Sequence, residues 1–207
     1  DYGQGLAKVV EENFKALGGE VVAFEAVTPG ESDYSAPLAA VASAKPEALY
    51  FGGYNAEASV LVNQMEAAGL AGVVFFGGDG IYGKDFLAKV GDKGEGVYSA
   101  TLVPPGTDPI LKFNKAYMDA TGTEAGVLSA YTWNSYDAVG ALIKAINSVA
   151  IVEGETLYIP RGALVAAVRG MKDYQGIAGV ITCKENGECN ASGPVFYIVK
   201  GGDWVPA

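Results

Sequence analysis

Two short stretches decide the fold of this chain: YFGGYNAE at residues 50–57 and FFGGDG at residues 75–80. Each is an apolar run typical of a β-strand that ends in glycines and then delivers a polar side chain, Tyr54 in the first and Asp79 in the second. In an open parallel sheet, ligands bind at the carboxyl ends of neighbouring strands. The sequence therefore predicts that Tyr54 and Asp79 form a ligand-facing pair.

Helical and strand patterns alternate regularly around these two stretches. Asn55 is expected to cap the helix that follows the first stretch, because a short polar side chain at that place satisfies free backbone N–H groups. The predicted helices cover residues 2–17, 35–44 and 57–68, and the predicted strands cover residues 21–27, 48–53, 72–76 and 96–102.

After Pro104 and Pro105 the pattern changes, and we place a crossover there. Helices are predicted over residues 109–121, 128–149 and 160–171, and a returning pair of strands over residues 179–182 and 194–200, around a cysteine loop. The order βαβαβ, then helices, then a β-pair predicts the α/β class, with one Rossmann-like parallel-sheet lobe plus pieces of a second lobe.

Composition excludes several classes of protein. The chain has 207 residues, of which 50% are hydrophobic and 18% charged, so it is long enough for a sizeable core. The net charge of −10 is spread along the chain and argues against nucleic acid or anionic membranes as partners. No stretch reaches the ~20 apolar residues of a membrane span. No secretory signal opens the chain, which looks as if it begins in mid-protein.

The chain has no histidine, which excludes Ser-His-Asp and Cys-His catalysis and the usual catalytic zinc ligand sets. Its two cysteines, Cys183 and Cys189, flank Asn186-Gly187, a signal for a type I′ hairpin turn. Such a turn brings the cysteines close enough to bridge, and we predict a disulfide. The alternative is two free thiols in a cytosolic protein, although exposed thiols at a loop tip oxidise readily. An exported protein is the favoured interpretation.

Residues 78–83, GDGIYG, formally match the G-x-G-x-x-G fingerprint of dinucleotide-binding proteins. Two features argue against that function. Asp79 would face a pyrophosphate with a like charge, and the residues after Gly83 do not promptly give a clean apolar helix. A nucleotide-dependent enzyme is therefore the least favoured hypothesis.

Several motifs in the right order resemble the extracytoplasmic branched-chain amino-acid (Leu/Ile/Val-type) binding proteins of ABC transporters, in the type I periplasmic-binding-protein family. They are DYGQGLA at residues 1–7, SDYS at 32–35, the two opening stretches, YTWNSYDAV at 131–139 and GGDWVP at 201–206. The resemblance implies two α/β lobes joined by three crossovers, with a ligand in the cleft and hinge closure on binding.

The resemblance also implies a division of the chain. Residues 1–104 correspond to a second-lobe α/β domain, residues 105–178 to a crossover and helices that pack on the first lobe, and residues 179–207 to a returning β-hairpin and C-terminal strand. A first lobe and the strand before Tyr2 are expected to be absent from this sequence. The helices near residues 129–171 should then expose an apolar face.

Carried over residue by residue, the resemblance places Asp79 where it accepts the α-ammonium group of an amino acid, and Tyr54 where it packs on or hydrogen-bonds to the ligand. Tyr2 matches a second cleft aromatic, and Tyr131 an aromatic from the first-lobe side. Each residue also has a purely structural alternative. Asp79 can be a turn residue and Tyr54 the buried end of a strand. Tyr2 can pack the start of its helix against the core, and Tyr131 can pack against the long helix. An Asp at position 79, where the commonest pattern has Glu, leaves the branched-chain specificity open.

The resulting expectation is a non-catalytic, cofactor-free solute-binding component of an ABC importer, located in the periplasm or outside the cell. It is expected to bind an amino acid and to be associated with the membrane through an ABC permease. The alternative is a ligand-binding sensor or regulator module on the same fold. A DNA-binding or transmembrane segment elsewhere in the protein would favour this alternative.

Overall fold

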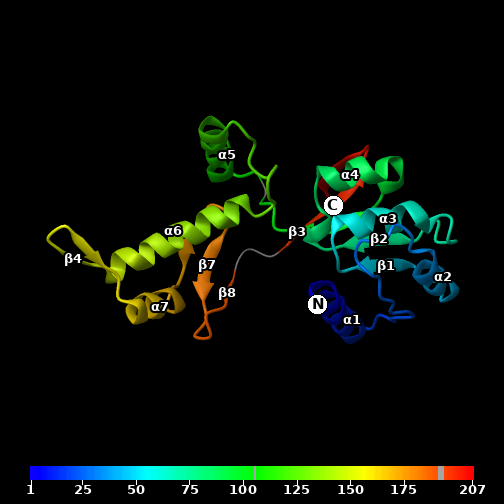
Figure 1. Cartoon of the computed structure of the whole chain (residues 1–207), viewed down its shortest axis with the longest axis horizontal. Helices are drawn as coiled ribbons and strands as arrows, with labels where there is room; N and C mark the ends of the chain where they lie inside the picture. Colours follow the sequence, from blue (N-terminus) through cyan, green and yellow to red (C-terminus); the bar gives the residue numbers. More distant parts are fainter. Residues whose placement is uncertain (105, 191–193) are drawn as a thin grey trace. The chain divides into compact units, whose positions relative to one another are not determined.

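The computed structural model describes residues 1–104, 106–190 and 194–207. The chain forms two compact units (Figure 1). Unit 1 contains Asp1–Thr101 and Val195–Ala207, and unit 2 contains Leu102–Pro194. Pro105, where the sequence places the crossover, lies outside the described residues.

Unit 1 is built on a five-stranded sheet with the strand order β1-β2-β3-β9-β10. The first three strands are parallel, whereas β9 runs antiparallel to both β3 and β10. The strands are β1 (Ala48–Phe51), β2 (Val74–Gly77), β3 (Tyr98–Thr101), β9 (Val195–Lys200) and β10 (Asp203–Pro206).

Helices cover the sheet of unit 1, and Figure 1 shows α3 and α4 on one side of it and α1 on the other. Alternate strand residues such as Phe75 and Val199 form the main core with Leu61 and Phe86 of the helices. The segments are α1 (Tyr2–Ala16), α2 (Ser35–Ser43), α3 (Asn55–Met65), α4 (Lys84–Val90) and the 3₁₀ turns η1 (Asp79–Ile81) and η2 (Gly91–Gly94).

Unit 2 is organised around the long helix α6, with α7 packed along it. Ala141 and Ala145 of α6 form a small core with Met171 and Cys183. Figure 1 shows the β4 hairpin beyond one end of α6. The elements are α5 (Asp108–Thr121), α6 (Thr132–Val149), β4 (Ile151–Glu153), β5 (Thr156–Tyr158), α7 (Arg161–Arg169), β6 (Tyr174–Gln175), β7 (Val180–Cys183) and β8 (Cys189–Asn190).

Two polar side chains of α6 hold the neighbouring segments of unit 2. The indole N–H of Trp133 donates to the side-chain oxygen of Asn114 on α5 at 2.7 Å. The carboxylate of Asp137 is buried and accepts hydrogen bonds from the backbone N–H groups of Ile177 and Ala178, both at 2.8 Å. Both side chains therefore have structural roles.

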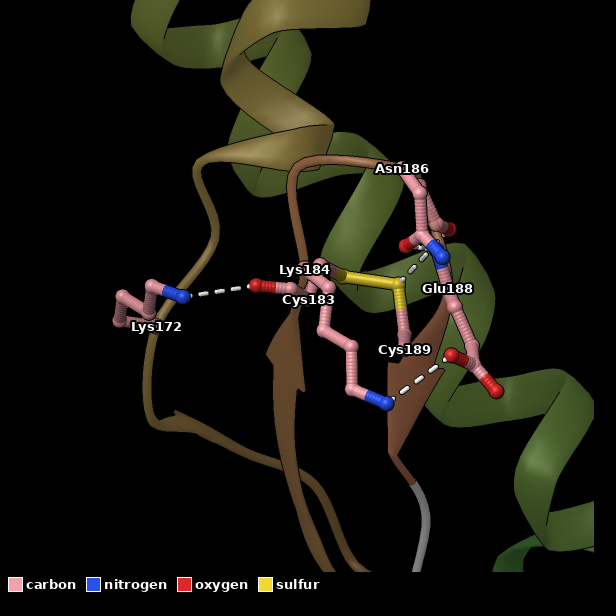
Figure 2. Close-up of polar contacts among 7 residues, drawn as sticks. Lys172, Cys183, Lys184, Asn186, Glu188 and Cys189 are labelled. Carbon is pink, nitrogen blue, oxygen red and sulfur yellow. Dashed lines mark hydrogen bonds and ion pairs between the residues drawn. A yellow bond between two sulfur atoms is a disulfide. The ribbon is translucent and has the colours of Figure 1, made fainter.

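The predicted disulfide between Cys183 and Cys189 is confirmed, and it joins paired residues of β7 and β8 (Figure 2). The turn inside it is not type I′, because Gly187 has a positive φ of 93° but Asn186 does not. The N–H of Gly187 donates to the carbonyl of Lys184, and the N–H of Lys184 to that of Glu188. This pattern is a three-residue hairpin loop with glycine in its left-handed position.

The predicted α/β fold class is confirmed, but three local expectations are wrong. Residues 21–27 form no strand, and among the described residues no strand pairs with them. Residues 180–183 pair with β6 and β8, whereas β9 pairs with β3 and β10, so the last strands form two separate ladders. Asn55 is the first residue of α3 rather than its cap, a place taken by Tyr54 without a side-chain hydrogen bond.

Candidate functional site

Three of the predicted site residues lie together in unit 1. The hydroxyl of Tyr2, in the first turn of α1, donates to Oδ1 of Asp79 at 3.1 Å. The rings of Tyr2 and Tyr54 are stacked, with their centroids 5.4 Å apart and an angle of 23° between their planes. A carboxylate and two aromatic rings therefore meet at the carboxyl ends of β1 and β2, where the sequence predicts a ligand.

Glycines allow the three segments to approach one another. A Cβ atom on Gly52, directly after β1, would lie 2.5 Å from the carbonyl oxygen of Gly3 in α1. A Cβ atom on Gly80 would lie 2.7 Å from the carbonyl oxygen of Gly53 and 3.1 Å from the Tyr54 ring. Since both neighbours are backbone atoms that cannot rotate away, only glycine fits at these two positions without a backbone shift.

The electrostatics of the cluster favour a cationic partner. Partial burial, followed by the charge of Asp79 and its hydrogen bond, raises the pKa of Tyr2 to about 12. At neutral pH the phenol is therefore a donor, and Asp79 is the acceptor. Within the described part of the chain Asp79 makes no ion pair, because the three salt bridges all join other residues. Of its two oxygens, Oδ1 accepts the hydrogen bond from Tyr2.

Tyr131, the fourth predicted site residue, belongs to unit 2, where it directly precedes α6. Its side chain is exposed, and its backbone N–H donates to the hydroxyl of Ser129 at 3.1 Å. Its carbonyl accepts from Ser135 in the first turn of the helix. These contacts fix the backbone of Tyr131 and leave its ring accessible.

Sequence reasoning missed two residues next to Asp79. Ser99 on β3 is fully buried, and its hydroxyl donates to the carbonyl of Gly78 at 2.9 Å. Tyr50 on β1 stacks on Phe76, and burial together with the charge of Asp79 raises the pKa of its phenol. A serine in an apolar strand is the only signal for the first, and nothing in the sequence distinguishes the second from a core aromatic.

The expectation that no helix promptly follows Gly83 is wrong. Helix α4 begins at Lys84, directly after Gly83, because Phe86 and Val90 bury one side of this short helix in the core. Asp79 lies in the first position of η1 between the glycines, so a pyrophosphate there would meet a like charge. The described ranges contain no group of three or more His, Cys, Asp or Glu side chains that could hold a metal ion.

A family model described as periplasmic binding protein matches residues 1–203, nearly the whole chain. The chain belongs to the periplasmic binding protein family. This is a family of binding proteins rather than enzymes, as the sequence predicts. In the parts of the chain that the structure describes, no helix combines the length and apolar character needed to cross a membrane.

Sequence relatives of this family member are Leu/Ile/Val-binding proteins. Homolog 3 of Brucella melitensis is 29% identical over 202 residues, which are 98% of this chain and 52% of the relative. Homolog 2 of Brucella abortus is 34% identical over 148 residues, which are 71% of this chain and 38% of the relative. The chain thus spans about half the length, or less, of these curated relatives.

Solved structures agree with the fold. The leucine binding protein LivK of Thermotoga maritima superposes with a TM-score of 0.84 at 28% identity, covering 100% of this chain and 56% of that one. LivJ of Streptococcus pneumoniae, solved in complex with isoleucine, has a TM-score of 0.77 at 23% identity, covering 99% and 55%. The similarity to LivJ concerns the fold alone.

Proposed function

We propose that the chain is part of an extracytoplasmic solute-binding component of an ABC importer and that its solute is an amino acid of the branched-chain type or a related small polar molecule. The observation that carries the proposal is the environment of the Asp79 carboxylate. Its carboxylate has no ion-pair partner among the described residues, receives a hydrogen bond from Tyr2, and lies beside stacked aromatic rings. This arrangement is complementary to a primary ammonium group.

Each site residue has a proposed role. Asp79 accepts hydrogen bonds from the α-ammonium group, because charge-assisted hydrogen bonds are about twice as strong as neutral ones. Tyr54, whose side chain is 57% exposed, covers the ligand with its ring. Tyr2 donates to Asp79 and packs against Tyr54. Tyr131, whose side chain is exposed, is proposed as a further aromatic contact of the ligand.

The relatives support the class of solute. Those of B. melitensis and B. abortus are named Leu/Ile/Val-binding proteins, and the LivK of T. maritima is named a leucine binding protein. The shorter Asp79 side chain, compared with the glutamate of the commonest pattern, leaves more space for the anchored amine or for a bridging water. Related small polar solutes therefore remain part of the proposal.

The chain's division into lobes is also a proposal. Residues 1–104 form a second-lobe domain, residues 105–178 provide the crossover and the helices that pack on a first lobe, and residues 179–207 contain the disulfide hairpin and the strands that return to the sheet of the second lobe. The exposed apolar side chains of α6 support it, because an uncovered apolar helix face favours burial against another element. They are Tyr136, Val139, Leu142 and Ile143.

The proposed mechanism is closure of two lobes around the solute. A ligand that contacts both lobes binds the closed state more tightly, so it shifts the hinge equilibrium toward that state. A permease in the membrane then recognises the closed shape. The disulfide between Cys183 and Cys189 supports a location in the periplasm or outside the cell, since disulfides persist in oxidising compartments.

A thermal-shift screen with amino acids, amides, sugars and nucleotides tests the proposal. The screen uses this chain and, in parallel, a chimera that adds the half of the B. melitensis relative that the chain does not span. A ligand at ~100 times its dissociation constant stabilises by about 2.7 kcal/mol, which raises Tm by several degrees. Stabilisation by amino acids that is lost in Asp79→Asn supports the proposal. Stabilisation only by sugars or nucleotides, or an unchanged response of the variant, contradicts it.

A further inference from the structure

The peptide that precedes Asp79 is held by a side chain from the neighbouring strand. Ser99 lies on β3 opposite Gly77 of β2, in parallel register. Its side chain is completely buried, and its hydroxyl donates to the carbonyl oxygen of Gly78 at 2.9 Å. Gly78 directly precedes Asp79 and caps η1. The hydroxyl of Ser99 thus contacts the residue that directly precedes Asp79.

The same peptide is packed from the other face of the sheet. A Cβ atom on Gly78 would lie 3.3 Å from Cδ2 of Leu6 in α1 and 3.6 Å from the hydroxyl oxygen of Tyr50. Tyr50 is in register with Phe76 and Tyr98, and Ser99 is the next residue after Tyr98. Successive residues of a strand point to opposite faces, so Ser99 and Tyr50 approach Gly78 from opposite sides. Of these groups, only the hydroxyl of Ser99 makes a directional contact with the Gly78 carbonyl.

The Gly78 carbonyl has a second hydrogen-bond donor, so the effect of Ser99 on the position of Asp79 can be distinguished from its effect on stability. The Gly78 carbonyl also accepts from the N–H of Ile81 at 3.3 Å, within η1. Loss of the Ser99 hydroxyl therefore does not leave a buried carbonyl without a donor, which is the costly outcome for stability. It leaves Gly78 with one longer hydrogen bond, and the orientation of Asp79 becomes less restricted.

We propose that Ser99 is a positioning residue for the Asp79 carboxylate, acting through the Gly78 carbonyl to hold Asp79 in the orientation that receives an ammonium group. This role rests on the proposed function of Asp79. Ser99 acts through one neutral hydrogen bond, which keeps the Asp79 carboxylate preorganised. The ligand then does not have to order η1 when it binds.

The test compares Ser99→Ala with Ser59→Ala. Ser59 on α3 is also buried, and its hydroxyl also donates to backbone carbonyls, those of Asn55 and Ala56. Its hydroxyl bonds to neither Asp79 nor Gly78, and it is therefore a matched control for the loss of a buried hydroxyl. The readouts are amide hydrogen exchange of Ile81 without ligand and the Kd for leucine, isoleucine and valine by titration calorimetry.

Ser99→Ala is expected to accelerate exchange at Ile81 and to raise Kd by about 3- to 10-fold, the range of one neutral hydrogen bond. Ser59→Ala is expected to leave the exchange rate and the Kd unchanged, although it lowers Tm by as much as Ser99→Ala or more. Unchanged exchange in Ser99→Ala, or equal effects of the two variants, overturns the proposal. If the wild-type protein binds no amino acid, the proposed function fails by itself, and the exchange comparison still decides whether Ser99 orders the Asp79 turn.

Discussion

The site loops of unit 1 and the disulfide loop of unit 2 are both short turns that depend on glycine, but they are held in different ways. The loop closed by Cys183 and Cys189 is held by a covalent bond between residues six apart in sequence (Figure 2). The candidate site is held by backbone packing and by the hydrogen bonds of Tyr2 to Asp79 and of Ser99 to Gly78, among segments up to 77 residues apart. A structural loop can thus be closed locally, whereas the proposed ligand site is assembled from distant, non-covalent contacts.

The largest expected effect comes from opening the covalent loop. Cys183→Ser with Cys189→Ser should lower the free energy of unfolding of unit 2 by about 2–4 kcal/mol, because the unfolded chain gains freedom and a serine is buried at position 183. The side chain of Cys183 is 1% exposed in a small core, so the upper half of this range is expected.

The two tryptophans allow each unit to be followed separately. Trp133 is in unit 2 and Trp204 in unit 1. In a Trp204→Phe background, urea unfolding monitored by fluorescence should shift to lower urea when the cysteines are replaced or when reductant is added. Equal midpoints with and without the disulfide would contradict this account of unit 2.

The next effect comes from blocking the packing of the site. Gly52→Ala should lower the free energy of unfolding of unit 1 by about 1–3 kcal/mol, the usual cost of overpacking. The new Cβ atom would lie 2.5 Å from the carbonyl oxygen of Gly3 and 3.3 Å from the backbone nitrogen of Ala7, so α1 must move. Urea unfolding in a Trp133→Phe background, where Trp204 reports, measures this change.

Gly5→Ala is the matched control for that substitution. Gly5 also lies near the start of α1, but nothing is within 4 Å of its added Cβ atom. Alanine is favoured over glycine inside a helix, so this variant should gain roughly 0.5–1 kcal/mol. Opposite signs for Gly5→Ala and Gly52→Ala are expected, and destabilisation of similar size by both would refute the packing argument.

The smallest effect concerns the phenol of Tyr2. Its pKa in the folded protein is raised to about 12, above the value near 10 for the unfolded chain. The resulting stabilisation is therefore fully present below pH 10 and is lost as the pH rises toward 12. It is small, because the Tyr2 side chain is 47% exposed.

Alkaline difference absorbance of the twelve tyrosines measures this titration. Tyr2→Phe should remove one phenol from the late-titrating group. Tyr82→Phe should remove another, because burial among aromatic rings raises the pKa of Tyr82 to about 12 as well. A late-titrating group of unchanged size in Tyr2→Phe would show that Tyr2 does not face Asp79.

The sequence predicts local features of both regions better than their tertiary contacts. Helix α1 and its stop at Gly18, the strands before Tyr54 and Asp79, and the disulfide all follow from local periodicity or residue type. Residues 21–27 have the pattern of a strand, but a strand also needs a hydrogen-bonding neighbour, and none is present among the described residues. The pairing of β9 with β3 is likewise a tertiary outcome.

The candidate site shows the same limit. Glycines after a strand suggest a turn, so the positions of Tyr54 and Asp79 are predictable. The close approach of Gly52 to Gly3 and the hydrogen bond from Ser99 to Gly78 cannot be predicted from the sequence, because they join segments that only the folded sheet brings together. A hydroxyl in an apolar strand cannot be assigned a partner until the register of the strands is known.

The central claim is that Asp79 binds the ammonium group of an amino acid, and a thermodynamic cycle tests it most directly. Titration calorimetry gives the Kd of wild type and Asp79→Asn for the best-bound branched-chain amino acid and for its α-hydroxy analogue, with exposed Asp92→Asn as control. The account predicts a coupling of about 1.5–3 kcal/mol between the carboxylate and the ammonium group, and an unchanged preference in Asp92→Asn. If Asp79→Asn keeps the wild-type preference for the amino acid over its analogue, the claim is wrong.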